Sequence, residues 1–444
     1  EVTLGDTTGH SRSVRNNRGY VRTLRIQCPW KNVMSDSLRA RSLRPDERDE
    51  MIRLQCRVFR SDGYERYTRY LDGDPDYHFD QTRVVVCDHR LIATLRVWDR
   101  RMRIGTVTVR VGGIGGVGTH PDFRNRGAAT VMLHDVTQYL FDADYDLGVL
   151  FSEIPCSFYS RLGWSILPLS GFTLTIGKFT EKRTEFPMKV LPFCESRDLS
   201  GTMQLYARHN QSLSGTLVRS PEYWTSAPSR IRGVLPTVVV RTSSDIVGYL
   251  NYEFTDDSFI IHEVVCSEKY PDALLVLMEF VLKECRDHNI CVVRGEFCYR
   301  HPFVQKMMER TAADLVLSGN GTMMLYPVNL NRLIQRLLPL WQSRLEKSLN
   351  RPGPVQFVVS MGQQSCRVQL TEDGTLYSEP DERNQMTVPI GQELLLRMIF
   401  GETGWQRVCS MNLVNQQEVP TEISRLFRTI FPEQPLTFWS PDHF

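Results

Sequence analysis

Six consecutive residues in the first third of the chain have the types expected at an anion-binding helix start. Arg124-Asn125-Arg126-Gly127-Ala128-Ala129 leads into an apolar helical pattern that runs to Leu140. The first N–H groups of a helix have no partner within the helix, and the helix dipole adds positive potential there. Small residues at 127–129 allow a close approach to the backbone, and Arg124 and Arg126 can donate charge-assisted hydrogen bonds. The segment is therefore predicted to bind a diphosphate.

A tyrosine in an aromatic segment is the second candidate for chemistry. Phe158-Tyr159-Ser160-Arg161-Leu162-Gly163-Trp164 comes one helix and one short strand after the arginine-rich segment. A phenol can donate one proton, so Tyr159 is a candidate general acid. The alternative is that Tyr159 only packs beside Phe158.

A glycine-rich run precedes the arginine-rich segment and imitates another kind of site. Gly113-Ile114-Gly115-Gly116-Val117-Gly118 matches the G-x-G-x-x-G pattern of dinucleotide-binding folds. That fold requires a helix that opens within the glycines. Here Thr119-His120-Pro121-Asp122 intervenes, and the helix begins later, so a nicotinamide or flavin site is not favoured.

The elements around these segments predict a mixed α/β first region. A periodic run that follows Arg44-Pro45-Asp46-Glu47 and continues through Phe59 predicts a helix, and the helix from Ala128 follows several extended segments. The predicted strands are Thr82–Cys87, Leu91–Val97, Arg103–Val111 and Leu147–Phe151.

Two further regions follow. Residues 181–328 repeat the element order of the first region, which predicts an internal duplication. The predicted elements there are strands Thr237–Val240, Ile246–Phe254, Phe259–Val265 and Ile290–Gly295 and a helix Pro271–Asp287. The third region begins with a predicted helix Leu330–Leu349. Strands Val355–Ser360, Ser365–Leu370 and Gln385–Pro389 and helices Gln392–Phe400 and Glu422–Phe431 are predicted after it.

Composition excludes several classes of protein. Lys plus Arg number 53 and Asp plus Glu 51, a balance that argues against a nucleic-acid-binding protein. No apolar run is long enough for a membrane span. The 11 cysteines are scattered without a CxxC pair, so neither a metal site nor a disulfide framework is expected. Reduced thiols in a cytoplasm fit this pattern better.

The N-terminal segment differs from the rest of the chain. Residues 1–33 contain six Lys or Arg against two acids and have no sustained periodicity, so they are expected to be disordered. They are either a basic, flexible arm or a leader upstream of a natural start at Met34.

The two motifs together resemble those of the GCN5-related N-acetyltransferase (GNAT) superfamily. Thr119 to Ala129 resembles its cofactor motif, and Phe158 to Trp164 its later F-Y-x-x-x-G-F/W segment. The resemblance implies acetyl-CoA as cosubstrate, with Val117 and Thr119 against the pantetheine arm and residues 124–129 against the diphosphate. It also implies that Tyr159 protonates the departing thiolate.

The whole organisation resembles the enhanced intracellular survival (Eis) family within that superfamily. The resemblance implies an α/β fold of tandem domains: a catalytic GNAT domain at 34–180, a degenerate second GNAT domain at 181–328 and a sterol-carrier-protein-like domain at 329–444. It further implies a cytoplasmic homohexamer, and a catalytic base formed by the α-carboxylate of Phe444. Glu153 is a possible substitute base, and the tail before Phe444 has an ordinary packing role as its alternative.

The acceptor amine is the least determined feature. Acidic residues alternate with tyrosines in the segment 62–80, which forms either a wall for a polycationic amine or a solvated face. The family resemblance implies aminoglycosides, lysine side chains or polyamine-like compounds. Two rival functions remain open: transfer of a longer acyl group, and a non-catalytic scaffold that binds CoA or lipid.

Overall fold

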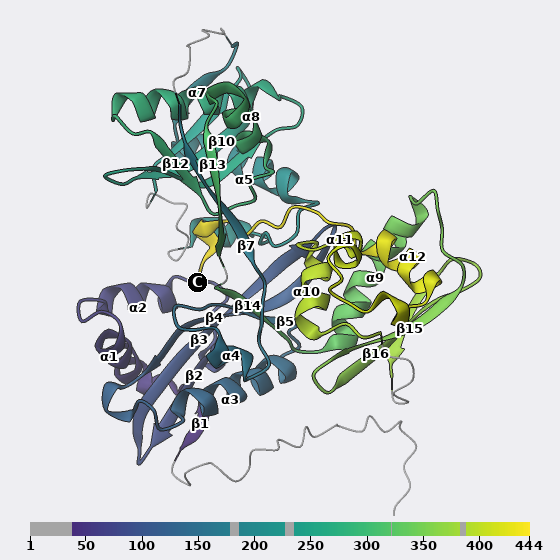
Figure 1. Cartoon of the computed structure of the whole chain (residues 1–444). Helices are drawn as coiled ribbons and strands as arrows, with labels where there is room; N and C mark the ends of the chain where they lie inside the picture. The colour runs from purple at the N-terminus through teal and green to yellow at the C-terminus, as the bar shows by residue number, and fades with distance from the viewer. Residues whose placement is uncertain (1–37, 178–185, 227–234, 321, 382–387) are drawn as a thin grey trace, which may run out of the picture. The chain divides into compact units, whose positions relative to one another are not determined.

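The structure is a computed structural model that describes residues 38–177, 186–226, 235–320, 322–381 and 388–444 (Figure 1). Residues 38–444 belong to one compact unit, which contains two seven-stranded mixed sheets and a three-stranded antiparallel sheet. The mixed α/β class predicted from the sequence is confirmed. The predicted leader, residues 1–33, lies outside the described residues.

The first sheet holds the segments that the sequence analysis singled out. Its order is β1-β2-β3-β4-β5-β14-β6, and β4 and β5 run parallel while the other neighbours are antiparallel. The strands are β1 (Arg39–Ser42), β2 (Thr82–Cys87), β3 (Arg90–Ile104), β4 (Val107–Thr119), β5 (Leu147–Phe151), β6 (Ser165–Ile166) and β14 (Met323–Pro327). The predicted strand Arg103–Val111 is wrong, because the chain reverses at Gly105, whose φ is +56°.

Helices cover both faces of this sheet. Successive side chains on a strand point to opposite faces, and on β2 Val84 packs with α1 (Arg48–Val58) while Val85 packs with α3 (Ala128–Asp142). The helix α2 (Tyr64–Asp72) follows α1, and the short α4 (Ser157–Ser160) carries Tyr159. Apolar side chains at helical spacing on α3, from Met132 to Leu140, fill the core beneath it.

The second sheet repeats the order of the first. It runs β8-β9-β10-β11-β12-β7-β13, again with one parallel pair, between β11 and β12. Its strands are β7 (Leu169–Thr175), β8 (Lys189–Pro192), β9 (Thr237–Arg241), β10 (Ile246–Phe254), β11 (Phe259–Cys266), β12 (Val292–Gly295) and β13 (Asp314–Asn320). Its helices are α5 (Glu195–Asn210), α6 (Pro221–Thr225), α7 (Asp272–Asp287) and α8 (Pro302–Thr311). The predicted duplication of element order is confirmed.

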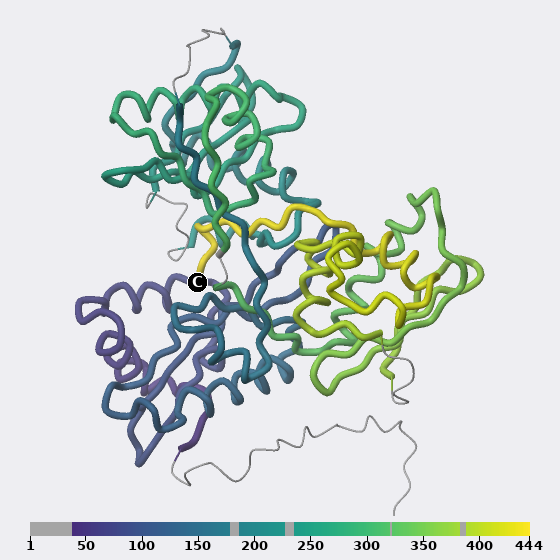
Figure 2. The backbone as a smooth tube through the Cα atoms, viewed as in Figure 1, coloured from purple at the N-terminus to yellow at the C-terminus, as the bar shows by residue number. Residues whose placement is uncertain are grey.

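The two sheets also exchange a strand. β7, which precedes the predicted boundary at 180, lies between β12 and β13 of the second sheet. β14, from the second region, lies between β5 and β6 of the first. Figure 2 follows these two crossings of the chain. Each sheet is therefore incomplete without a segment that the sequence assigns to the other region.

The third region shares its core with the first sheet. Its sheet consists of β15 (Val355–Met361), β16 (Gln364–Leu370) and β17 (Leu376–Pro380), and its helices are α9 (Leu330–Glu346), α10 (Gln392–Phe400), α11 (Trp405–Ser410) and α12 (Thr421–Ile430). Leu337 and Trp341 of α9 belong to one buried cluster with Ile104 of β3 and Phe357 of β15. Residues 388–390 form no strand, and the rest of the predicted strand Gln385–Pro389 lies outside the described residues.

The glycine run lies on β4, not in a nucleotide-binding turn. A Cβ built on Gly112 would lie 2.3 Å from Leu140 Cδ2 of α3. A Cβ built on Gly113 would lie 2.6 Å from the Phe444 ring, and a Cβ built on Gly118 would lie 3.0 Å from the Phe59 ring. At these glycines, other side chains occupy the space that a side chain of β4 would fill.

Two further observations concern membrane spans and disulfides. None of the described helices is long and apolar enough to cross a membrane. No disulfide joins any two of the ten cysteines in the described segments.

Replacing Gly112 with alanine should test this packing. The new methyl group would overlap Leu140, and overpacking of this kind costs about 1–3 kcal/mol of unfolding free energy. Gly319→Ala is the matched control, because a Cβ there has nothing within 4 Å, and we expect a change within about 0.5 kcal/mol. Urea denaturation of both variants checks this, and equal stabilities would contradict the close approach of α3 to β4.

Candidate active site

A large cavity opens where β4, the start of α3, α4 and the end of the chain meet. Its volume is about 1140 Å³. Seven of the eight residues predicted to bind the cofactor line it, as do both predicted catalytic residues. These are Val117, Thr119, Arg124, Asn125, Gly127, Ala128, Ala129, Tyr159 and Phe444. The chain thus brings together at one cavity segments that lie more than 300 positions apart in the sequence.

Arg126 is the predicted residue that does not line the cavity. Its guanidinium lies 5.2 Å from the centre of the Phe123 ring, in a cation–π contact. Arg124 faces the cavity, and its Nε donates to the Thr119 carbonyl at 3.4 Å. One arginine of the pair is therefore directed to the cavity and the other to an aromatic neighbour.

The sheet opens beside this cavity. β4 pairs with β5 only from Val111 to Ile114, whereas β4 itself continues to Thr119. A bulge between Thr94 and Arg96 of β3, with Gly116 at a φ of +61°, bends β4 at this point. Beyond Ile114, the β5-facing edge of β4 has no strand partner among the described residues. Its N–H and C=O groups can bond an amide-containing ligand in the manner of an added strand.

The start of α3 supplies the second ligand-binding element. Gly127 is the N-cap residue, its φ is +85°, and no side chain caps the helix. A Cβ on Gly127 would meet nothing within 4 Å, so space remains over the first turn. Uncapped N–H groups at the start of a 15-residue helix favour an anion. These residues fit the diphosphate and pantetheine amides of an acyl-CoA, on the evidence of an open strand edge and an open helix start.

Tyr159 is positioned by aromatic packing. It is buried on α4, 5.1 Å from the Phe158 ring and 6.4 Å from the Trp164 ring between centroids. Burial, with smaller contributions from Cys156 and Glu153, raises the pKa of Tyr159 to about 12. The phenol therefore keeps its proton at neutral pH, as a general acid must.

The end of the chain lies directly on β4. A Cβ built on Gly115 would lie 3.1 Å from the main-chain carbonyl carbon of Phe444 and 3.0 Å from Trp98 Nε1. The Phe444 ring lies over Gly113 and 5.6 Å from the Phe151 ring. Aromatic contacts and the missing side chains of β4 thus fix Phe444 inside the cavity.

Sequence reasoning missed other groups that line the cavity. They are Arg96, Trp98 and Arg100 of β3, Tyr223 of α6, and Asp442 and His443 of the tail. The Arg96 guanidinium lies 3.5 Å from the centre of the Trp98 ring and pairs with buried Asp74 at 2.5 Å. The alternation of β3 places residues 96, 98 and 100 on one face, a signal that the sequence offered.

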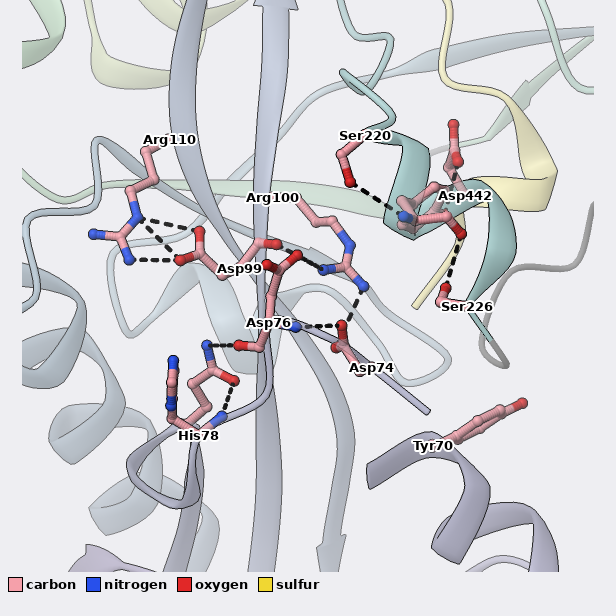
Figure 3. Close-up of polar contacts among 12 residues, drawn as sticks. Tyr70, Asp74, Asp76, His78, Asp99, Arg100, Arg110, Ser220, Ser226 and Asp442 are labelled. Atoms are coloured by element: carbon pink, nitrogen blue, oxygen red, sulfur yellow. Dashed lines mark hydrogen bonds and ion pairs between the residues drawn. The ribbon is translucent and has the colours of Figure 1, made fainter. Parts of the chain in front are cut away.

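The acidic segment 62–80 does not form a carboxylate wall. None of its six acids lines the cavity; Arg66, Tyr67 and Tyr70 line it instead. Asp74 is buried and lies 3.5 Å from Arg100 as well as against Arg96, and Figure 3 shows its contact with Arg100. The other five are exposed, so the solvated-face interpretation describes them. The segment is acidic as its sequence shows, but its carboxylates face solvent or the buried arginines and not the cavity.

Comparison with known proteins agrees with this geometry. Residues 39–167 match the family model of the acetyltransferase (GNAT) domain. No curated protein matches the chain.

Solved structures of similar fold span the described chain at low sequence identity. A conserved Enterococcus faecalis protein, described as a probable N-acyltransferase, is 14% identical with a TM-score of 0.71 over 92% of this chain and 100% of its own. A GCN5-related N-acetyltransferase of Kribbella flavida is 18% identical, with a TM-score of 0.67 over 92% of this chain and 98% of its own. Eis1 of Mycobacterium abscessus is 14% identical, with a TM-score of 0.61 over 92% of this chain and 100% of its own. Residues 39–167 therefore resemble a GNAT acetyltransferase domain in sequence, within a chain whose fold is Eis-like.

Proposed function

We propose that this protein is an N-acetyltransferase that transfers the acetyl group of acetyl-CoA to a primary amine. One observation carries the proposal: an open strand edge, an uncapped helix start, a protonated phenol and the end of the chain line one cavity. The first two fit the pantetheine and diphosphate of the cosubstrate. The last two are a proton donor and a proton acceptor, the pair that this reaction needs.

Proton movements define the roles of the two catalytic candidates. In a chain that ends at Phe444, its α-carboxylate accepts a proton from the acceptor ammonium, which frees the nitrogen lone pair to attack the thioester carbonyl. The new C–N bond forms as the C–S bond breaks, and the nitrogen releases its second proton to solvent. Tyr159 donates its proton to the departing sulfur, and its high pKa keeps that proton available.

Two other groups could take the place of the base. Glu153 and His443 both line the cavity, and the His443 ring lies 4.1 Å from the Phe151 ring. We favour the Phe444 carboxylate because its carbonyl carbon and Trp98 Nε1, a donor that suits an anion, both approach the same glycine of β4, Gly115.

The acceptor class stays open among aminoglycosides, polyamine-like compounds and lysine side chains. Because the segment 62–80 contributes Arg66 and no carboxylate to the cavity, amines that also carry an acidic group belong in the same comparison. The rival functions, transfer of a longer acyl group and a non-catalytic scaffold, are distinguished by the same assay.

The deciding experiment follows free thiol release from acetyl-CoA with a panel of these amines, and repeats it with longer acyl-CoAs. Release with acetyl-CoA supports the proposal. Faster release with a longer acyl-CoA would reassign the acyl group. Binding of CoA by calorimetry with no release from any pair would favour the scaffold.

Tyr159→Phe should lower kcat by roughly tenfold or more, because the thiolate would leave without an acid. The dissociation constant of CoA should change little, since the ring and its packing remain. Tyr326→Phe is the matched control: Tyr326 packs on Trp164 at 5.5 Å between centroids but does not line the cavity. Steady-state kinetics of both variants check this, and unchanged kcat in Tyr159→Phe would remove the assigned acid.

Two glycines appended after Phe444 should lower kcat on the order of a hundredfold, because the carboxylate would leave its place over Gly115. Glu153→Gln and His443→Gln serve as the comparison, and each should retain more activity than the extended chain. Kinetics of the three proteins at one pH check this. A fully active extended chain would exclude the terminal carboxylate, and the more impaired of the two point variants would then identify the base.

A further inference from the structure

The segment that delivers Phe444 to the cavity is held by residues of the second region, in its sheet, its helices and the loop after α5. Successive contacts attach it there in chain order: Thr437 N donates to Ser214 O at 2.9 Å, Trp439 Nε1 donates to Asn210 Oδ1 at 2.9 Å, and Ser440 Oγ lies 2.8 Å from His262 Nδ1. All three partners lie between residues 210 and 262. The tail therefore acts on the first sheet while it is anchored to the second.

A buried ion cluster completes this attachment. Arg219 donates from Nε and Nη2 to the two carboxylate oxygens of Asp442, each at 2.9 Å. Its Nη1 and Nη2 also donate to Glu263, at 3.0 and 2.7 Å. The Tyr223 hydroxyl donates to Asp442 at 2.9 Å, and Tyr249 donates to Glu263. The side chains of Arg219, Glu263 and Asp442 are fully shielded from solvent.

The electrostatics keep Arg219 charged, whereas burial raises the pKa of Glu263. Burial alone would lower the pKa of Arg219, but Asp442 and Glu263 outweigh it and hold the pKa well above its ordinary value. Arg219 also lies 3.9 Å from the centre of the Tyr206 ring, in a cation–π contact. A planar guanidinium held at both edges and on one face has one orientation, so it fixes the orientation of the Asp442 carboxylate as well.

We propose that Arg219, with Glu263 behind it, is a positioning clamp that holds Asp442 and thereby sets the location of the Phe444 carboxylate over Gly115. The inference rests on the proposed role of that carboxylate as the base. Two residues of chain span at most about 7 Å, so a displacement of Asp442 reaches Phe444 with little attenuation. Arg219 touches neither substrate nor the reacting atoms, and it acts only through the tail.

The clamp gives the second sheet a part in catalysis. The loop of the second region that corresponds to the cofactor motif, Ser267-Glu268-Lys269-Tyr270-Pro271, has neither the glycine nor the two arginines of residues 124–129. A region without its own cofactor motif thus retains a function by holding the base of its neighbour.

The test is Arg219→Lys, which keeps the positive charge but cannot form the two parallel hydrogen bonds to the Asp442 carboxylate. Arg241→Lys is the matched control, because Arg241 donates to the buried Asp198 at 2.6 Å in the same region without touching the tail. We expect kcat to fall roughly tenfold or more in Arg219→Lys with the KM for acetyl-CoA unchanged, and Arg241→Lys to behave as the parent. Asp442→Asn loosens the same contact from the tail side and replaces Arg219→Lys if the latter does not fold.

A second measurement reads the tail without relying on activity. Carboxypeptidase A, which prefers aromatic C-terminal residues, should release Phe444 at least several-fold faster from Arg219→Lys than from the parent and from Arg241→Lys. If Arg219→Lys and the parent release Phe444 at equal rates and have equal kcat, the proposed clamp is wrong. It is also wrong if Arg219→Lys loses kcat while Phe444 stays protected from the protease. If the chain extended by two glycines is fully active, the base assignment fails, and with it the catalytic meaning of the clamp. Faster release of Phe444 would then show only that Arg219 anchors the tail.

Discussion

The cavity depends on a strand whose second half is mostly glycine. β4 carries glycine at five of the seven positions from 112 to 118, and groups from elsewhere in the fold occupy the vacated space. Leu140 of α3 approaches Gly112, the Phe444 ring lies on Gly113, and the Phe444 main chain lies beside Gly115. On the same strand Gln55 of α1 approaches Gly116. Protein interiors tolerate little overlap, so even one methyl group at these positions would displace a neighbour.

This clearance also determines where a ligand can bind. Because Gly116 adopts a left-handed conformation in a bulge, β4 turns away from β5 after Ile114 and exposes a backbone edge. The strand then leads through Thr119 to the uncapped start of α3. The edge and the helix start are therefore consecutive along the chain, which suits a long ligand with amides at one end and phosphates at the other.

The local parts of this site were predictable from the sequence, and the distant parts were not. Tyr159 and the residues of the motif at 124–129 other than Arg126 reach the cavity as expected, because each segment adjoins a helix that its own sequence encodes. Phe444 was placed by family resemblance, not by pattern. The exchange of β7 and β14 and the Arg219 cluster depend on contacts between residues far apart in sequence, which no periodicity reveals. The sterol-carrier-like character of residues 329–444, the domain boundaries and the homohexamer stay predictions.

The duplication explains how two unlike strands come to hold one tail. By its place in the sheet order, β11 of the second sheet corresponds to β4 of the first. β4 accepts the tail by having no side chains at Gly113 and Gly115, whereas β11 holds it through His262 and Glu263, the latter by way of Arg219. A glycine strand can shape a cavity but cannot orient a charged chain end, and a charged strand can orient it but leaves no room beside itself. The two copies of the fold therefore divide between them the two requirements of the proposed tail-supplied base, and under that proposal the second copy has a function without a cofactor motif.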